Sequence, residues 1–529
     1  IDGVIYGSTR NFESTSGTNS TSDPLFTDVS SFDYTLQYNS PAIGNASSSS
    51  ATANDLNDIT RPQGTSDDIG AYEYRNTWTG SSSTDWGTTS NWDQAYEPNA
   101  NTESPIIADV TNQPVISSDD GSGNDGNVIL EDILINSGAE LTINADAALT
   151  LEGDFTNNSG TVTLNSNSTN FASIIVKGAS SGNIVYNRYV NAVGTNEWDL
   201  VGSPVVGQSI NSFASANNSP LATNGDQYAI GTFDNTQSSV ADAWTNYTTS
   251  TIGSAGDFDI GKGYQMGTDS GATLAFTGTI ATTDQVESVI DNSSSGYRWN
   301  LVANPYPSYL YLNSAADGTN NVISVNTAIG NQIIDSNFGA VYGWEANGTT
   351  MASYDNNDGA KYIAPGQAFM IAPSSSSSVD FDFTEAMQTT IRGNDFVHDS
   401  PMTYQEIYLN LYNEDLIMGQ THIRFRENMT LGLNPSYDVG HFNQDDPITT
   451  RLVEDDNGIN FEHQNLPLSA MENAVIPLVI NQAAGQEFRI NLHTATIPDP
   501  NVYLEDVEEG TFTNLYEGDF VYTPTSDLS

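Results

Sequence analysis

A series of short apolar runs at eight-residue spacing constrains the fold of this chain more than any other feature. The runs ILIN, LTIN and LTLE begin at Ile133, Leu141 and Leu149. Apolar and polar side chains alternate within them, which is typical of a β-strand with one buried face. Three such strands predict one triangular coil of a β-solenoid, and a meander of hairpins is the alternative. The residues expected to face inward are Ile133, Ile135, Leu141, Ile143, Leu149 and Leu151.

Length, charge and residue usage exclude several classes of protein. At 529 residues the chain is too long for a single hydrophobic core. Its 13 Lys and Arg against 66 Asp and Glu give a net charge of −53, which repels nucleic acid and anionic membranes. Without cysteine it has no disulfide, thiolate metal site or cysteine nucleophile. No apolar run reaches the roughly 18 residues of a transmembrane segment.

Three tryptophans lie close together just before the eight-residue repeat. The stretch NTWTGSSSTDWGTTSNWD holds Trp78, Trp86 and Trp92. Indoles at this spacing can stack on sugar rings, which makes them candidate glycan-binding residues, or they can fill a small core. The pattern resembles a module of large secreted proteins of Bacteroidota that introduces solenoid-like segments, so we expect a Trp-rich, solenoid-like β module over residues 76–182.

A longer pattern occurs twice. WDLVGSPV and WNLVANPY lie about 100 residues apart, and GKGYQM is echoed by PGQAFM. The alternating apolar residues predict strands, and the prolines that follow end them. We therefore predict two copies of one β-sandwich, at residues 183–290 and 291–395, and no nucleophile or acid–base pair stands out inside a copy. The matching residues are Trp198 and Trp299, Pro204 and Pro305, and Trp244 and Trp344.

The first 75 residues carry the phrases DPLFTD, LQYNSPAIGN and RPQGTSDDIGAYEY. This arrangement resembles the C-terminal end of secreted right-handed parallel β-helix proteins, where such phrases cap the last coil. The resemblance implies that residues 1–75 are the end and cap of a β-helix that lies mostly before residue 1. A cap is needed because the last coil exposes unpaired strand edges. The candidate covering residues are Ile43, Ile69, Ala71 and Tyr72.

Two acidic, glycine-containing loops suggest calcium, the one cofactor that the sequence offers. Their carboxylate and amide oxygens are the hard ligands that calcium prefers, although neither loop has the full pattern of an EF-hand. A flexible loop explains the first equally well, and an Asn/Asp-Gly turn explains the second. The candidate ligands are Asp119, Asp120, Asn124 and Asp125 in the first loop and Asp355, Asn357 and Asp358 in the second.

The last part, residues 396–529, holds every histidine. Their spacings match no zinc motif, and none forms an evident nucleophile–base pair. Arg424 and Arg426 would share one face of a strand, where they either grip a carboxylated or sulfated glycan or neutralise the acidic surface. The histidines are His398, His422, His441, His463 and His493.

The phrases YRWNLVANPYPS and IAPGQAFMIAP, and the segment from Thr421 to Gly440, carry the most specific resemblance. They resemble stretches upstream of the C-terminal sorting signal in proteins exported by the type IX secretion system of Bacteroidota. The resemblance implies secretion to the cell surface or medium, with the export machinery as a partner. It also implies a terminal β-sandwich that precedes a sorting domain not contained in these residues.

Together these patterns predict an all-β protein: the end of a parallel β-helix, a solenoid-like β module and several β-sandwich domains. We expect a noncatalytic structural or adhesive region of a large bacterial surface protein, with glycans or other surface proteins as partners. The alternatives are the accessory tail of a β-helix polysaccharide lyase or glycosidase, with its active site upstream, and a filament subunit. The enzyme lacks support because Asp67 and Asp68, adjacent on a strand, would point to opposite faces.

Overall fold

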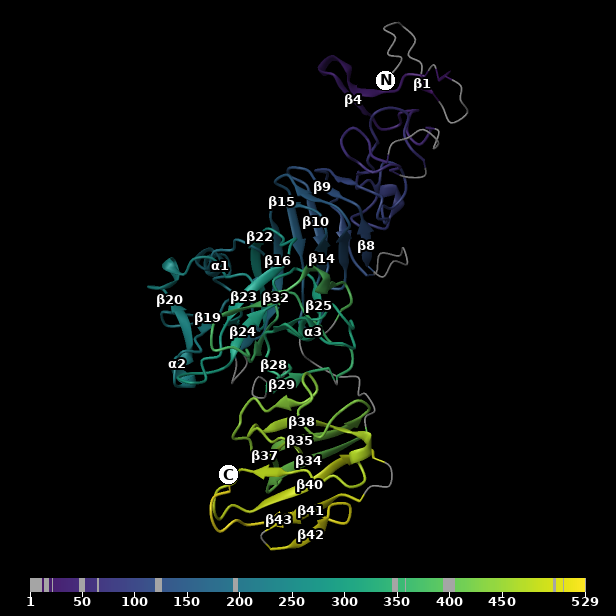
Figure 1. Ribbon diagram of the computed structural model, residues 1–529. Helices are drawn as coiled ribbons and strands as arrows, with labels where there is room; N and C mark the ends of the chain where they lie inside the picture. Colours follow the sequence, from purple (N-terminus) through teal and green to yellow (C-terminus); the bar gives the residue numbers. More distant parts are fainter. Residues whose placement is uncertain are drawn as a thin grey trace.

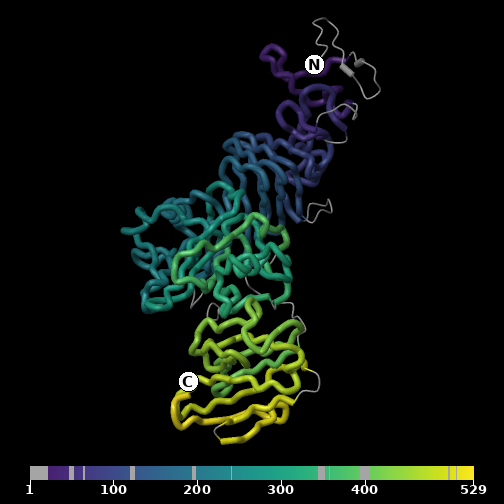
Figure 2. Tube along the Cα trace, viewed as in Figure 1, coloured from purple at the N-terminus to yellow at the C-terminus, as the bar shows by residue number. Residues whose placement is uncertain are grey.

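The computed structural model is almost entirely β, with 40% of residues in strands and 6% in helices, as the sequence predicts. The chain forms an elongated body with the N-terminal segment at one end and a large sheet at the other (Figures 1 and 2). No helix in the described part is long and apolar enough to cross a membrane. The described residues are 12–13, 19–20, 22–46, 53–63, 66–118, 126–193, 198–344, 351–356, 358–392, 405–497, 501–507 and 509–528.

A β-solenoid of about four turns follows the N-terminal segment. Strands β9 (Ile133–Ile135), β10 (Glu140–Ile143) and β11 (Ala148–Leu151) form one turn, and each pairs in parallel with strands of the turns before and after it. The residues predicted to face inward are at most 1% exposed, so the predicted coil is confirmed. The stacked strands are β5 (Thr77–Trp78), β6 (Ile106–Ile107), β7 (Val115–Ile116), β8 (Asn127–Leu130), β12 (Phe155–Asn157), β13 (Thr161–Leu164), β14 (Ser173–Val176) and β15 (Ser180–Ser181).

One corner of the solenoid is held by a ladder of aspartates. Asp132 Oδ1 accepts the backbone N–H of Asp154 at 2.6 Å, and Asp154 Oδ1 accepts that of Ala179 at 2.7 Å. A Cβ on Gly153 or Gly178 would lie 2.4 Å from these carboxylates. The glycine before each step of the ladder is therefore required by the close approach of consecutive turns.

The N-terminal segment is built on buried carboxylates. Arg61 pairs with Glu73 at 2.6 Å, and Glu73 also accepts the backbone N–H of Asp68 at 2.8 Å. Asp68 accepts backbone N–H groups of Gly44 and Tyr74, so its carboxylate organises the chain locally. Asp67 is buried as well, so both side chains of this adjacent pair are enclosed by the protein.

The same segment contacts the solenoid that follows it. Gln63 donates to the carbonyl of Thr102 and accepts the backbone N–H of Ser104, both at 2.7 Å. Of the residues proposed to cover a preceding coil, Ile43, Ile69 and Tyr72 are half-buried and Ala71 is exposed. The hairpin of this segment consists of β3 (Phe26–Asp28) and β4 (Asp33–Leu36).

The two repeated segments contain sheets with the same strand order. In the first, β17 (Asp199–Val201) pairs with β21 (Tyr264–Met266), then β19 (Gln227–Phe233), then β20 (Trp244–Thr248). In the second the order is β24 (Asn300–Ala303), β31 (Ala368–Ile371), β28 (Val341–Trp344) and β29 (Met351–Tyr354). Trp244 opens β20 whereas Trp344 ends β28, so these two tryptophans are not structural equivalents despite their sequence spacing.

The repeated phrases form the contact between the two copies. The backbone N–H of Gly202 donates to Gly366 at 2.8 Å, and that of Ala303 donates to Gly261 at 2.7 Å. The strand that follows the tryptophan in each copy thus ends with a backbone hydrogen bond to the glycine turn of the other copy. A Cβ on Gly202 would lie 2.3 Å from the Cβ of Ala303, so this position has no room for a side chain.

The solenoid and the first copy share one core. Strand β16 (Ile184–Val190) pairs in parallel with β13 of the solenoid and antiparallel with β22 (Ala272–Gly278) of the copy. A single cluster of buried residues runs from Trp78 to Ile280. The remaining elements of the two copies are α1 (Ile210–Ala216), β18 (Thr223–Asn224), α2 (Val240–Ala243), β23 (Gln285–Val289), β25 (Tyr309–Tyr311), α3 (Val322–Asn326), β26 (Thr327–Ala328), β27 (Asn331–Gln332), β30 (Tyr362–Ile363), β32 (Val379–Phe383) and β33 (Gln388–Thr389).

The terminal unit is an eight-stranded sheet. One face packs on a hydrophobic core that includes Ile407, Leu409 and Leu411, and the other face carries the polar and aromatic side chains that alternate with them. The strands are β34 (Gln405–Asn413), β35 (Leu416–Arg426), β36 (Val439–Gly440), β37 (Ile448–Thr450), β38 (Phe461–Pro467), β39 (Leu478–Ile480), β40 (Phe488–Ala495) and β43 (Phe520–Tyr522), and a separate hairpin consists of β41 (Tyr503–Asp506) and β42 (Thr511–Asn514).

Candidate functional site

The densest group of ionisable side chains lies at the junction between the second copy and the terminal sheet. Aromatic and backbone contacts close this junction. Trp299 stacks on Phe442 with ring centroids 4.2 Å apart, and Tyr342 donates to the carbonyl of Gly440 at 2.8 Å. The backbone N–H of Gly440 in turn donates to Asn337 at 2.7 Å. Side chains at the centre of this contact are therefore removed from water.

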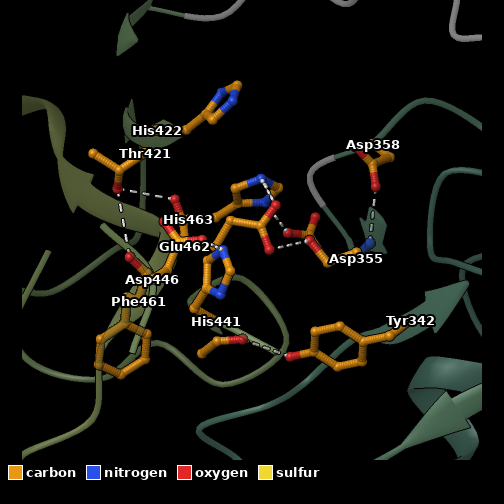
Figure 3. Close-up of polar contacts among 12 residues, drawn as sticks. Tyr342, Asp355, Asp358, Thr421, His422, His441, Asp446, Phe461, Glu462 and His463 are labelled. Carbon is orange, nitrogen blue, oxygen red and sulfur yellow. Dashed lines mark hydrogen bonds and ion pairs between the residues drawn. The ribbon is translucent and has the colours of Figure 1, made fainter. Parts of the chain in front are cut away.

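The ionisable group, here called the junction cluster, draws residues from both sides (Figure 3). Its central contact joins His463 Nδ1 of β38 to Asp355 Oδ2, which follows β29, at 3.2 Å. The His463 side chain is 8% exposed and that of Asp355 is fully buried. The other ring nitrogen, Nε2, lies 3.6 Å from Glu462. The cluster consists of Asp355, Asp358, Glu406, His422, Arg424, Glu462 and His463.

Strand register explains how the terminal sheet contributes its part. Parallel pairing places His422 of β35 directly opposite His463 of β38, so both rings leave the same face, with centroids 4.9 Å apart. On the other side, Tyr408 of β34 stacks on His422 at 3.8 Å. Arg424, two residues further along β35, lies 3.5 Å from Glu406.

The environment moves the pKa values of these groups in different directions. Burial and Arg424 lower the pKa of His463, but its contact with Asp355 and the charge of Glu462 outweigh them, and the net shift is upward. Burial and the neighbouring Asp355 raise the pKa of Asp358 to about 6. Burial lowers the pKa of His422 to about 4, although Glu406 opposes this shift. At neutral pH the cluster therefore holds a neutral His422.

The arrangement of the cluster differs from that of a Ser-His-Asp triad. In a Ser-His-Asp triad, the histidine nitrogen remote from the acid must face a nucleophile. His463 Nε2 faces the Glu462 carboxylate instead, and the nearby Thr421 hydroxyl donates to the carbonyl of Glu462 at 3.1 Å. Nor does any group of three or more His, Asp or Glu side chains in the described ranges have the arrangement of a metal site.

One family model spans the solenoid, the two copies and the terminal sheet. A family model described as a domain of unknown function, DUF8693, matches residues 77–528. The chain belongs to this family. No curated protein and no solved structure matches it. The DUF8693 match begins at the first solenoid strand, β5, and includes both copies, the terminal sheet and every residue of the junction cluster.

The tryptophans predicted from the sequence lie inside the DUF8693 region, in its interior. Trp78 and Trp86 are fully buried and Trp92 is 2% exposed. Trp86 and Trp92 pack edge to face at 4.7 Å, and each indole N–H donates to a backbone carbonyl. No ring face is left for a sugar, so the structure supports the core interpretation and corrects the glycan-binding one.

The predicted calcium ligands fall into two groups. Asp119, Asp120, Asn124, Asp125 and Asn357 lie outside the described residues, so calcium at the first loop stays a prediction. Asp355 and Asp358 have partners within the protein. Asp355 contacts His463, and Asp358 Oδ2 accepts the backbone N–H of Asp355 at 2.9 Å. These two carboxylates lie at the junction between the second copy and the terminal sheet, and calcium at this loop stays a prediction.

Arg424 and Arg426 lie two residues apart on one strand, β35, as the sequence predicts. Arg424 is 7% exposed and lies inside the junction cluster, and the Arg426 guanidinium lies over the ring of Tyr437 at 5.0 Å. His441 pairs with Asp446 at 3.3 Å within the terminal unit. His493 packs edge-on against Tyr408, and His398 lies outside the described residues. Sequence spacing could not bring His463 and Asp355 together, because they are 108 residues apart.

Proposed function

We propose that this chain is a noncatalytic structural stalk within an adhesive, cell-surface protein. The continuity of the body carries this proposal. The solenoid continues into the first copy through β16 and β22, the two copies exchange reciprocal backbone hydrogen bonds, and the second copy meets the terminal sheet through stacked aromatic rings. Units joined in this way hold their relative orientation, unlike domains on flexible linkers.

The chemistry of the described residues supports a scaffold more than an enzyme. Catalytic carboxylates need a route to substrate, whereas Asp68, Glu73 and Asp355 are buried and bonded to backbone or to a cation. The acidic surface, with a net charge of −53, keeps such a stalk soluble and apart from like-charged neighbours. We extend the proposal to secretion through the type IX system, on the sequence resemblance alone.

Exchange of the DUF8693 region inside the full-length protein tests the stalk. Residues 77–528 are replaced either by an unrelated stiff β-repeat array of equal length or by a Gly/Ser linker with the same number of residues. Attachment of cells to their natural surface is then measured. A stalk predicts that the stiff replacement keeps attachment and that the flexible one loses reach. Loss of attachment with both replacements would show that this region itself holds the ligand-binding surface.

Incubation of the purified chain with a panel of polysaccharides tests the enzyme alternative. The chain should release no new reducing ends or unsaturated products. Cleavage by the chain alone would overturn the proposal. A chain that binds a glycan without cleaving it would keep the adhesive part of the proposal and assign it to this region.

A further inference from the structure

An asparagine followed by a glycine can modify itself without an enzyme. Glycine has no side chain to shield its backbone nitrogen, so this nitrogen can reach the side-chain amide of the asparagine before it. The sequence holds three such dipeptides, which begin at Asn224, Asn347 and Asn457. Asn347 lies outside the described residues, and the other two asparagines are exposed.

The loop around Asn457 supplies the groups that this reaction needs. The backbone N–H of Gly458 donates to Asp456 Oδ1 at 2.9 Å, so a carboxylate contacts the proton that the nitrogen must lose. The backbone N–H of Ile459 donates to Asn457 Oδ1 at 3.1 Å. This bond polarises the side-chain carbonyl and folds it over the peptide bond to Gly458. Base, electrophile and nucleophile therefore lie on three consecutive residues.

An arginine holds the base in this position. Arg451 Nη1 lies 3.6 Å from Asp456 Oδ1, and its Nε donates to Asn460 Oδ1 at 2.7 Å. The guanidinium is thus fixed at one side and keeps the carboxylate beside the loop. The Asp456 side chain is 49% exposed, so water can enter and a small leaving group can escape.

The orientation of the Asn457 amide is set by its partners. Asn457 Nδ2 donates to Asn337 Oδ1 of the second copy at 2.5 Å. Asn337 Nδ2 donates to the Asp335 carboxylate at 2.9 Å, so the Asn337 atom that faces the loop must be its oxygen. Asn457 therefore presents its nitrogen to the second copy and its carbonyl oxygen to its own loop.

We propose that Asn457 is a self-modification site, which converts to aspartate or isoaspartate through a succinimide. The Gly458 nitrogen bonds to Asn457 Cγ as its proton passes to the Asp456 carboxylate. The bond from Cγ to Nδ2 then breaks, and Nδ2 leaves with that proton as ammonia. Water opens the succinimide at one of its two carbonyls, which gives aspartate or isoaspartate.

The conversion changes a contact between units, and it goes beyond the stalk function. The product has no side-chain N–H to donate, and its carboxylate faces the oxygen of Asn337. The junction between the second copy and the terminal sheet therefore loses one hydrogen bond and gains a negative charge. Because the reaction is irreversible, this change accumulates with the age of the molecule.

Asn224 is a control within the same chain. It ends β18, and the glycine that follows it has a positive φ of 65°, similar to the 82° of Gly458. In the described part of the chain, no hydrogen bond joins the Gly225 N–H to a carboxylate. A Cβ on Gly225 would meet nothing within 4 Å, so this turn also lacks a neighbouring guanidinium.

Site-resolved mass spectrometry of the full chain, incubated at neutral pH, measures the conversion at both sites. Digestion in water enriched in heavy oxygen marks any conversion that occurs during sample preparation. We expect Asn457 to convert at least about tenfold faster than Asn224, since general-base assistance alone contributes about a hundredfold or more. In urea the two rates should become similar, because both sites are then unfolded Asn–Gly peptides.

Asp456→Asn tests the base. The asparagine oxygen can still accept the Gly458 N–H, but an amide takes up a proton poorly, so conversion of Asn457 should slow by about tenfold or more. Asp455→Asn is the matched control, because it removes the same charge from the neighbouring residue. It should leave the conversion of Asn457 unchanged.

Three results would overturn the proposal. A folded chain in which Asn457 converts no faster than Asn224 does so without any variant, which covers the case in which Asp456→Asn does not fold. Equal effects of Asp456→Asn and Asp455→Asn would mean that net charge, and not the contact with Gly458, sets the rate. Conversion of Asn457 in urea alone would mean that the fold protects this asparagine.

Discussion

Replacement of Arg188 by methionine tests whether its buried guanidinium joins the solenoid to the second copy. Arg188 lies on β16, the last solenoid strand, and is fully buried. Its Nε donates to the carbonyl of Pro365 in the second copy at 2.9 Å, and another guanidinium nitrogen donates to the Tyr189 carbonyl at 2.6 Å. The guanidinium also lies over the ring of Phe171 at 4.3 Å.

The expected loss follows from these contacts. Each buried carbonyl left without a donor costs about 1–3 kcal/mol, and a desolvated cation–π contact contributes up to about 2 kcal/mol. Methionine fills much of the volume and removes a buried charge, which offsets part of the loss. We therefore expect Arg188→Met to lower the free energy of unfolding by about 3–5 kcal/mol, a large share of the stability of a typical domain.

Urea unfolding followed by tryptophan fluorescence measures this loss, because Trp78, Trp86 and Trp92 report on the solenoid and Trp299 reports on the second copy. Arg298→Met is the matched control. Arg298 also lies over a phenylalanine, Phe338 at 4.4 Å, but its side chain is 25% exposed and its ion pair is long, so we expect a loss below about 1 kcal/mol. If Arg188→Met costs no more than this control, the buried guanidinium does not join the units.

Three further changes test other parts of the structure. Trp86→Ala should destabilise the chain by about 3–5 kcal/mol in the same unfolding experiment, since the indole is fully buried. A small loss would indicate that the indole is exposed and is again a candidate for glycan binding. Gly202→Ala should lower the melting temperature, because the added Cβ would lie 2.3 Å from the Cβ of Ala303. Gly253→Ala is the control and should leave the melting temperature unchanged, because a Cβ added there meets nothing within 4 Å. Equal effects of the two changes would contradict the tight contact between the copies. Burial raises the pKa of Asp438 from 3.8 to about 7. The protonated Asp438 therefore contributes fully to stability below pH 3.8, and this contribution is lost as the pH rises towards 7, by up to about 1.4 kcal/mol per pH unit. Urea titrations at a series of pH values give the slope of the unfolding free energy against pH, and Asp438→Asn should flatten it. An unchanged slope would mean that other groups cause the pH dependence.

The solenoid was predictable because its signal is local. Each turn repeats short runs in which alternate side chains enter one narrow core, so the pattern around Leu141 and Leu149 specifies strand, face and coil at once. The tryptophans before it gave a weaker signal. Their spacing suits a glycan platform and a small core equally well, and only the fold shows that Trp86 is enclosed.

The duplication was predictable in its strands but not in its connections. The phrases at Trp198 and Trp299 occupy equivalent strands, β17 and β24. The match of Trp244 with Trp344 failed because the connections differ: β19 ends at Phe233 before a segment that contains α2, whereas β28 continues to Trp344 itself. Equal spacing along the chain therefore does not guarantee equivalent positions once two copies have different loops.

The junction cluster could not be found from sequence, because its two halves belong to different units and meet only through the docking of one sheet on another. Its energetic role also differs from that of the surrounding contacts. Burial of Trp299 against Phe442 is favourable whatever the exact angle between the units, whereas His463 and Asp355 repay their desolvation only at the observed geometry. The aromatic contact therefore supplies most of the attraction, and the ion pair selects one orientation. A change of His463 to a well-packed apolar residue should for this reason widen the range of angles more than it lowers the melting temperature.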